Sequence, residues 1–184
     1  WDGARDARRS AQNEVPLLTQ GEDYDVLMVA DIKGDFGEYL PYQTYDPRPV
    51  AGTQGLFSSA WYWTAEQWGA AQLQSRFEKH TSRHMQERDY ATWAAVRTIG
   101  EAVVRTGKND VASINKYIRS GEFELAGFKG RKLTYREWNG QLRQPIILTH
   151  ARSVVAQAPL AGFLHQFNEL DTLGYDKPQV KCQP

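Results

Sequence analysis

Two apolar stretches in the first third of the chain have the pattern of β-strands. Residues 26–30 form a continuous apolar run between Asp25 and Asp31, and such a run is typical of a strand buried on both faces of a parallel sheet. A second run at residues 55–61 predicts another strand, which leads into three adjacent aromatic residues. The residues between the two runs are rich in glycine, proline and other turn formers, so they predict loops.

Apolar residues then recur at helical spacing in three segments, which predict three helices. A Thr-x-x-Gln capping box at residues 64–67 marks the start of the first. The second is predicted over residues 87–105 and ends before Gly107, a residue type favoured at C-caps. The third begins at Asn109 or Asp110. The predicted inward residues are Tyr90, Trp93, Ala94, Ile99, Ala102 and Val103 on the second helix, and Val111, Ile114 and Ile118 on the third.

The pattern changes again at residues 132–138, where polar and apolar residues alternate. Asn139 and Gly140 follow, and residues 142–150 form a further apolar run. An Asn-Gly pair between two such runs is a strong hairpin signal, because both residue types accept the positive φ of a type I′ turn. Pro145 lacks a backbone donor, so it predicts an edge strand or a bulge in the second run.

The order of these elements predicts an α/β fold, with a mostly parallel sheet flanked by helices and an antiparallel hairpin at the C-terminal end. A chain of 184 residues is long enough for one good core, so we expect one main lobe at residues 21–158. Residues 1–20 form a polar leading segment without a clear period. Residues 159–184 are rich in turn formers and predict a tail that packs on this lobe or on a partner.

The charge of the chain narrows the set of partners. It has 22 basic and 22 acidic residues, and its formal net charge is zero. Such a chain has no overall field to hold a polyanion, which argues against nucleic acid as a partner. No apolar run approaches the roughly 20 residues of a membrane-spanning helix, so no membrane span is predicted. The chain starts at Trp1 without the features of a signal peptide, and its single cysteine, Cys182, has no partner for an internal disulfide.

The sequence has no signature of nucleophilic or phosphate chemistry, since it lacks a Gly-x-Ser-x-Gly elbow and a Gly-rich phosphate loop. We therefore expect no catalytic residue and no enzyme activity. Two alternatives stay open. Asp31 and Asp35 are close enough in sequence for acid–base chemistry. His80 and His84 share a helix face and form half of a metal site, but without a third ligand we expect two solvated histidines and no bound metal.

Two loops that follow the predicted strands hold the residues most suited to a small ligand. In open α/β sheets, ligands bind outside the carboxyl ends of the strands. Three adjacent aromatic residues cannot all point into one core, because neighbours on an extended chain alternate faces. The predicted ligand-binding residues are Asp31, Lys33 and Phe36 after the first strand, Trp61 and Trp63 after the second, and Tyr90 on the long helix. In the alternative interpretation, Trp61 and Trp63 cover a helix end and Tyr90 packs in the core.

Several stretches of the chain form longer motifs. They are DVLMVAD at residues 25–31, AGTQGL at 51–56, ERDYATWAAV at 87–96 and FKG at 128–130. These stretches resemble the C-terminal lobe of type I periplasmic solute-binding proteins, the branched-chain-amino-acid-binding class of ABC transporters. A second set, at residues 36–42, 45–55, 142–146 and 169–176, resembles the binding proteins associated with alcohol dehydrogenase systems that depend on pyrroloquinoline quinone (PQQ).

The resemblance implies a periplasmic-binding-protein type I lobe, which is one half of a clamshell that closes on a small ligand. It implies a location in the periplasm, a missing N-terminal lobe, and an ABC permease or a quinoprotein dehydrogenase as partner. The implied ligand is PQQ or a related quinone or aromatic acid, and no cofactor is required. Such a ligand favours ring stacking and cationic partners. The alternatives are a protein–protein interaction module of a quinoprotein dehydrogenase system and, less favoured, a metal-dependent enzyme.

Overall fold

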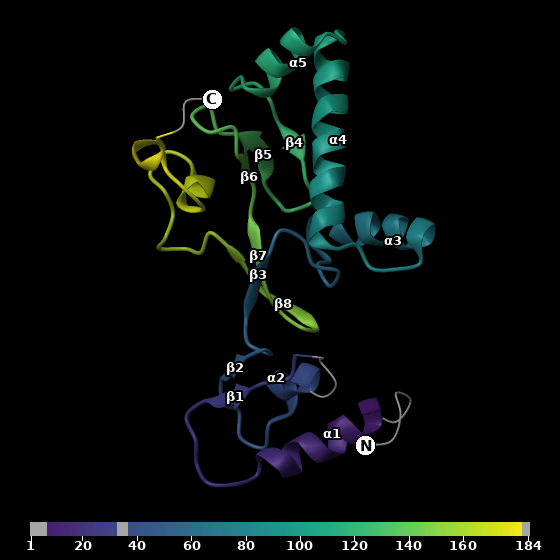
Figure 1. Cartoon of the computed structure of the whole chain (residues 1–184), viewed down its shortest axis with the longest axis vertical. Coiled ribbons are helices and arrows are strands. Elements are labelled where there is room, and N and C mark those ends of the chain that lie inside the picture. The colour runs from purple at the N-terminus through teal and green to yellow at the C-terminus, as the bar shows by residue number, and fades with distance from the viewer. Residues whose placement is uncertain (1–6, 33–36, 182–184) are drawn as a thin grey trace. The chain divides into compact units, whose positions relative to one another are not determined.

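The computed structural model of the chain describes residues 7–32 and 37–181, which form a mixed α/β structure (Figure 1). The chain divides into two compact units. The first contains residues 1–57 and 149–155, and the second contains residues 58–148 and 156–184. The chain passes between them within the strands of one sheet, which has the order β3-β7-β8. These strands are β3 (Phe57–Ser59), β7 (Ile146–His150) and β8 (Ser153–Ala158).

The first unit contains a short parallel sheet. β1 (Leu27–Val29) pairs with β2 (Val50–Gly52), and Leu27 lies opposite Val50. The leading segment, for which the sequence predicted no element, contains α1 (Ala7–Thr19). A 3₁₀ turn, η1 (Gly37–Tyr39), leads into α2 (Leu40–Gln43). The buried core of this unit is formed by Val15, Val29 and Leu40.

The sheets differ from the predicted mostly parallel sheet. β1 and β2 pair parallel, whereas β4–β5 and β5–β6 in the second unit pair antiparallel, and no sheet of the described residues has more than three strands. Met28 in the centre of β1 is 71% exposed, so the prediction of a strand buried on both faces was wrong. The reason is length, because three paired residues are too few to be covered by helices on two sides.

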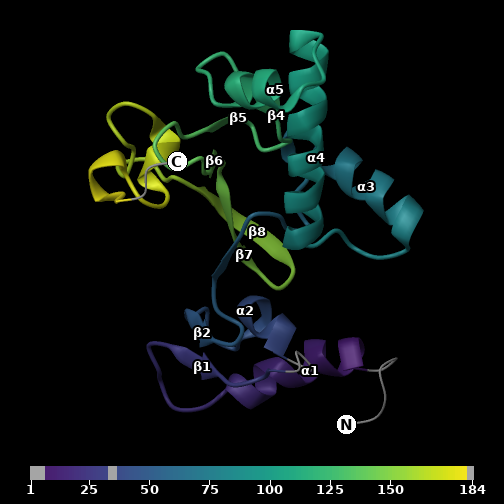
Figure 2. The same ribbon diagram turned by 45° about the horizontal axis from the view of Figure 1, so that its top comes forward.

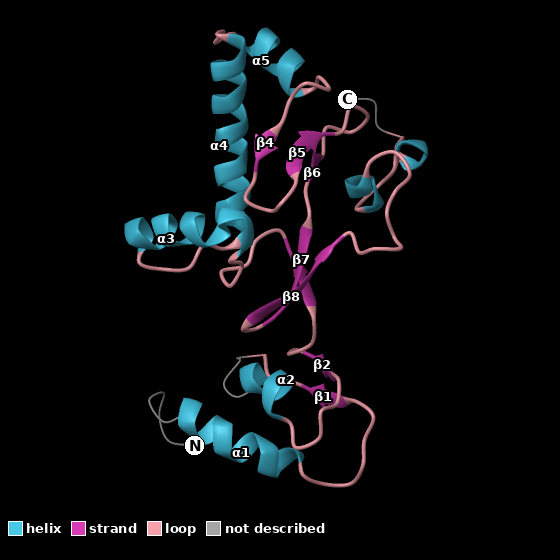
Figure 3. Cartoon of the chain, turned by 180° about the vertical axis from the view of Figure 1, so that it is seen from behind, coloured by secondary structure: helices cyan, strands magenta, loops and turns pink. Residues whose placement is uncertain are grey.

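The second unit contains the predicted helices (Figure 3). They are η2 (Gln67–Gly69), α3 (Ala70–Thr81), α4 (Glu87–Thr106) and α5 (Val111–Ile118). Both predicted ends of α4 are confirmed, since a capping box of Gln86 and Asp89 precedes it and Gly107 ends it with a φ of +65°. The predicted start of α5 is also confirmed, because the Asp110 side chain accepts a hydrogen bond from Ser113 N at 2.8 Å.

Three details of these helices were predicted wrongly. The chain enters α3 through η2, where Trp68 has a φ of +53°, and not through a capping box at residues 64–67. Ile99 on α4 is 53% exposed, and Thr98 takes the inward position, with its hydroxyl 3.0 Å from that of Tyr135. The inward row is Tyr90, Ala94, Thr98 and Ala102, a strict spacing of four residues that follows one ridge of the helix. Val111, in the first turn of α5, is exposed.

The predicted hairpin is confirmed. β5 (Lys132–Tyr135) and β6 (Leu142–Arg143) pair antiparallel, and β4 (Leu125–Ala126) pairs with the other edge of β5. The turn is not type I′, because only Gly140 of the Asn-Gly pair has a positive φ, and Asn139 instead accepts a hydrogen bond from Gln141 N. Pro145 separates β6 from β7, as its missing donor predicts. The tail contains η3 (Glu169–Thr172) and η4 (Lys177–Gln179).

The core of the second unit consists of two buried clusters joined through α4. The first is formed by Trp61, Ala70, Leu73, Met85 and Tyr90, and the second by Ala94, Phe123, Leu125 and Leu133. Trp93 packs against both clusters. In Figure 2, α5 and β4 lie beside α4, which agrees with the second cluster. α4 therefore supports the hairpin from one side through apolar contacts.

Candidate functional site

The hairpin brings two arginine side chains to one face. Residues of a strand alternate faces, so Thr134 and Arg136 share a side, and Arg143 lies opposite Thr134 on the neighbouring strand. The backbone N–H of Arg136 donates to Gln141 O at 2.9 Å, which continues the pairing beyond the end of β5. Arg136 and Arg143 are therefore neighbours across the hairpin.

A single carboxylate from the tail lies between the two guanidinium groups. Asp171 Oδ1 accepts hydrogen bonds from Arg136 Nε at 2.8 Å and from Arg143 Nε at 2.7 Å, and Oδ2 accepts one from Arg143 Nη2 at 3.2 Å. The side chains of Arg136 and Asp171 are 1% and 4% exposed. Burial by itself raises the pKa of Asp171, but the hydrogen bonds from Arg143 and Arg136 outweigh burial and hold the pKa below its usual value. We call these three residues the arginine cluster, and it has one positive charge in excess.

Further hydrogen bonds from Arg136 fasten the tail to the hairpin. Its Nη2 donates to the carbonyl oxygens of Leu170, at 3.0 Å, and Leu173. Its Nη1 donates to Gln141 Oε1 at 2.6 Å. The ring of Trp138 lies against both arginines, with its centre 5.0 Å from Arg143 Cζ and 5.7 Å from Arg136 Cζ. The cluster is thus held in place on several sides, which keeps its charges at fixed positions.

A pocket of about 140 Å³ opens beside the arginine cluster. It is lined by Arg136, Gln141, Leu142, Arg143, Gln144, Ile146, Leu170, Leu173 and Gly174. Gly174 has a φ of +93°, and a Cβ there would lie 2.9 Å from Arg136 Nη1 and Gln141 Oε1. Only glycine fits this conformation and this approach together. The lining combines guanidinium and amide groups with apolar side chains, an arrangement suited to a small organic anion.

Lys129 is a further buried cation in this unit, and it is 2% exposed. Its Nζ donates to Gln144 Oε1 at 2.7 Å and to Pro145 O at 3.1 Å, and it lies 4.4 Å from the centre of the Tyr90 ring. No carboxylate of the described residues forms an ion pair with it. Burial lowers the pKa of Lys129 to about 7, against a smaller opposing effect of Glu87. Because Gln144 also lines the pocket, this lysine lies directly behind the pocket wall.

The structure places two of the predicted ligand-binding aromatics in the core. Trp61 and Tyr90 are buried and stack on each other, with ring centres 4.8 Å apart and planes 11° apart. Trp61 Nε1 donates to Gln74 Oε1 at 3.0 Å, and the Tyr90 hydroxyl donates to Gly127 O at 2.8 Å. Both rings are therefore buried and stacked on each other, which for Tyr90 agrees with the alternative interpretation of core packing.

Trp63 lies nearer the surface and stacks on a histidine. Its ring centre is 4.3 Å from that of His84, with the planes 10° apart. His84 Nδ1 contacts the Glu78 carboxylate, and hydrogen bonds from Gln74 and His84 lower the pKa of Glu78. His84 is thus engaged by a ring and a carboxylate. Among residues 7–32 and 37–181, no group of three or more histidine, cysteine, aspartate or glutamate side chains is placed to hold a metal ion.

Asp31 is the one predicted loop residue after β1 that the structure describes. It is buried, its carboxylate accepts a hydrogen bond from Gly37 N at 2.8 Å, and its backbone N–H donates to Thr53 Oγ1 at 2.7 Å. These contacts join Asp31 to the first residue of η1 and to Thr53, which follows β2. Lys33 and Phe36 lie outside the described residues, as do Asp35 of the acid–base alternative and Cys182.

The sequence interpretation missed the arginine cluster, the pocket and Lys129. The alternation of residues 132–138 places Thr134 and Arg136 on one side, so a charged pair across the predicted hairpin could have been inferred. No local signal links this pair to Asp171, which is 35 residues from Arg136 in the chain. The burial of Lys129 likewise depends on contacts with Tyr90 and Gln144 that are distant in sequence.

Comparison with known proteins adds no relative. No protein-family model, no curated protein and no solved structure matched the chain. In the part of the chain that the structure describes, no helix combines the length and apolar character needed to cross a membrane.

Proposed function

We propose that this chain is a ligand-binding part of a solute-binding protein, and that its pocket holds the carboxylate of a small organic anion. The observation that carries the proposal is the arginine cluster, in which two guanidinium groups share one carboxylate beside a pocket. A buried cluster with one positive charge in excess favours a second carboxylate nearby. The ligand would supply that charge.

The size of the pocket limits what can enter it. Pockets for drug-sized ligands typically measure roughly 300 Å³ or more. The pocket beside the arginine cluster measures about 140 Å³, so it suits a small acid, or one carboxylate arm of a larger molecule. PQQ carries three carboxylates on a flat ring system, and one of these arms would fit while the rings stay outside. The resemblance to PQQ-associated binding proteins supports this choice of ligand.

The same resemblance supports the setting that we propose for this site. It favours the type I periplasmic-binding fold, a location in the periplasm, and an ABC permease or a quinoprotein dehydrogenase as the partner that receives the ligand. It also favours binding without catalysis. In such a fold a second, N-terminal lobe would supply the contacts to the rest of the ligand, and this lobe would by itself hold the anion weakly.

The test is a titration of the isotope-labelled chain, in which the side-chain N–H signals of Arg136 and Arg143 report on binding. Oxalate is the small-anion probe, PQQ is the candidate ligand, and methylammonium is the cation control. We expect oxalate to shift both signals, and Arg143→Gln to weaken oxalate at least about tenfold. Arg131→Gln removes an exposed arginine paired with Glu169 and is the matched control.

The outcomes separate the parts of the proposal. Arginine signals that do not respond to oxalate would refute the anion site. Binding of oxalate without binding of PQQ would support the anion site and refute PQQ as the ligand. Equal responses to oxalate and methylammonium would show that charge does not decide binding, which contradicts the role given to the arginine cluster.

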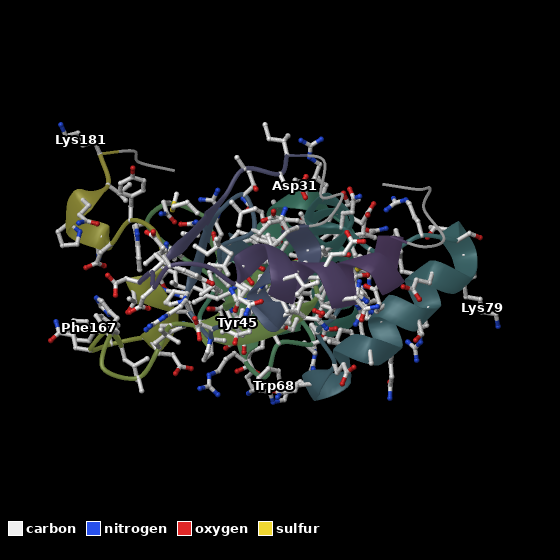
Figure 4. All side chains as sticks on the ribbon, turned by 90° about the horizontal axis from the view of Figure 1, so that it is seen from below. Asp31, Tyr45, Trp68, Lys79, Phe167 and Lys181 are labelled. Atoms are coloured by element: carbon white, nitrogen blue, oxygen red, sulfur yellow. The ribbon has the colours of Figure 1, made fainter. Side chains whose placement is uncertain are left out.

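A second candidate function, a protein interaction module, is favoured by the exposed apolar side chains of the tail. Leu160, Phe163, Leu164 and Phe167 are all exposed, and Figure 4 labels Phe167 among the outward side chains. A partner surface would cover such residues. In this case the double variant Phe163→Ser and Phe167→Ser would lose binding to the purified quinoprotein dehydrogenase and keep oxalate binding. The reverse result would favour the ligand-binding function.

A further inference from the structure

The side chain of Gln144 contacts Lys129 and also lines the pocket. Its Oε1 accepts a hydrogen bond from Lys129 Nζ at 2.7 Å, and the residue also lines the pocket. Its Nε2 group makes no hydrogen bond to any residue that the structure describes. The oxygen of the amide is thus occupied by the lysine, and its two N–H donors are available to a ligand.

We propose that Lys129 is a positioning residue that makes the pocket selective for anions, by holding Gln144 with its amide N–H groups toward the ligand. The inference rests on the proposed function, since it concerns the same pocket. An ammonium group has three donors and no acceptor, so it fixes the amide oxygen on its own side. The pocket then offers donors from Gln144 in addition to those of Arg136 and Arg143.

The environment of Lys129 makes this arrangement depend on pH. From α4, Lys129 is faced by the Tyr90 ring at 4.4 Å and by the charge of Glu87, and from the segment after β6 by Gln144 and Pro145 O. From β8, Gln157 donates to its backbone oxygen. Burial lowers the pKa of Lys129 to about 7, so the ammonium loses its proton near neutral pH.

Loss of that proton changes what the pocket presents. A neutral amine accepts a hydrogen bond, so the amide of Gln144 can turn and direct its oxygen toward the ligand. The positive charge behind the pocket wall is lost at the same time. Both effects weaken the binding of an anion, and binding and protonation are coupled reciprocally. We expect the affinity for an anion to fall about tenfold as the pH rises through 7.

The experiment measures the dissociation constant of oxalate, which is a dianion throughout, between about pH 6 and about pH 8. The expected result is a fall of about tenfold in affinity for the wild type and a weak, pH-independent affinity for Lys129→Met. Gln144→Leu keeps the lysine charge and removes the amide, so it should lose most of the pH dependence. Lys132→Met, which removes an exposed lysine of β5, is the matched control and should behave as the wild type.

Three results would contradict the inference, and they differ in what else they contradict. If oxalate binds with an affinity that depends on Arg143, but Lys129→Met keeps the affinity and pH profile of the wild type, only the role of Lys129 is refuted. If oxalate does not bind to the wild type at either pH, the proposed function is refuted as well. A measurement on the wild type alone covers the case in which Lys129→Met does not fold. The side-chain amide signals of Gln144 should move through one titration near pH 7, and signals that do not move would contradict the proposal.

Discussion

Arg136 and Lys129 are two buried cations in the same compact unit, and the structure accommodates them in opposite ways. Arg136 donates to the Asp171 carboxylate, to one amide oxygen and to two backbone carbonyls. Among the described residues, the acceptors of Lys129 are neutral, and the face of an aromatic ring lies beside it. Arginine stays protonated in proteins, so its burial requires a permanent partner charge. Lysine can give up its proton, and burial without a partner lowers its pKa instead.

Because of this difference, the arginine cluster and Lys129 can have different roles. The arginine cluster holds its charges in place through several hydrogen bonds, fastens the tail and lines the pocket. Lys129 is an adjustable charge behind the same pocket, because its pKa of about 7 lies near physiological pH. A buried ion pair is weak evidence for net stability, but the removal of one partner is strongly destabilising. Substitutions at the two sites should therefore differ in size and in pH dependence.

The largest effect is expected for Asp171→Asn, which leaves two guanidinium groups without a carboxylate. We expect it to lower the free energy of unfolding by about 3 to 5 kcal/mol at neutral pH. The Asp171 pKa is lowered in the folded state, so its contribution is present above the unfolded value of about 3.9 and is lost as the pH falls through the folded value. Urea unfolding of the wild type and the variant at a series of pH values measures the loss of unfolding free energy and its pH dependence. Glu169→Gln, at the exposed pair with Arg131, should cost less than about 1 kcal/mol.

Lys129→Met should change the pH dependence of stability. The folded pKa of about 7 lies below the unfolded value of about 10.4, so the folded state binds fewer protons between these values and stability rises with pH there. This rise amounts to roughly 4 kcal/mol. The free energy of unfolding of the wild type minus that of Lys129→Met should increase by this amount from about pH 7 to about pH 10. A constant difference would show that the lysine is not buried without a partner charge.

Local signals in the sequence were enough to predict the elements that support both sites. The C-terminal end of α4 and the start of α5 follow from caps at Gly107 and Asp110, because caps involve residues within one turn. The hairpin follows from alternation around Asn139 and Gly140. These signals depend on contacts within a few residues, so the packing of the rest of the chain does not override them.

The sites themselves depend on contacts that no local signal encodes. Asp171 meets Arg143 across 28 residues, and Lys129 becomes buried only because Tyr90 and Gln144 pack around it. The aromatic side chains Trp61 and Tyr90 were predicted as ligand contacts, with a helix-end cover and core packing as the respective alternatives, and in the structure both are buried in one cluster. The expected mostly parallel sheet was wrong because an apolar run does not reveal how many neighbours a strand will have, nor in which direction they run.

Gly130→Ala tests how closely the turn holds Lys129. Gly130 has a φ of +71°, and a Cβ there would lie 2.5 Å from Trp68 Cε2. Gly140 is the matched control, because it has a φ of +68° and open space around its Cβ position. We expect Gly140→Ala to cost about 1 kcal/mol from backbone strain alone, and Gly130→Ala about 2 kcal/mol because Trp68 must also move. Urea unfolding measures the difference, and equal costs would show that the ring of Trp68 moves freely.

The smallest effect on the free energy of unfolding is expected for substitutions of Trp138, whose ring lies against Arg136 and Arg143. Trp138→Leu removes the cation–π contacts with Arg143 and Arg136 and should cost about 1 kcal/mol. Trp138→Phe keeps a ring but loses the hydrogen bond from Nε1 to Tyr175 O at 3.3 Å. Trp138→Leu loses the same hydrogen bond, so the difference between the two variants reports on the ring, and the Phe variant should be the more stable of the two. Guanidinium groups in proteins keep their charge over this range, so the cost of the Leu variant should be the same at about pH 6 and at about pH 9, unlike that of Lys129→Met. A cost that changes with pH would mean that the pocket and Lys129 are coupled through this ring.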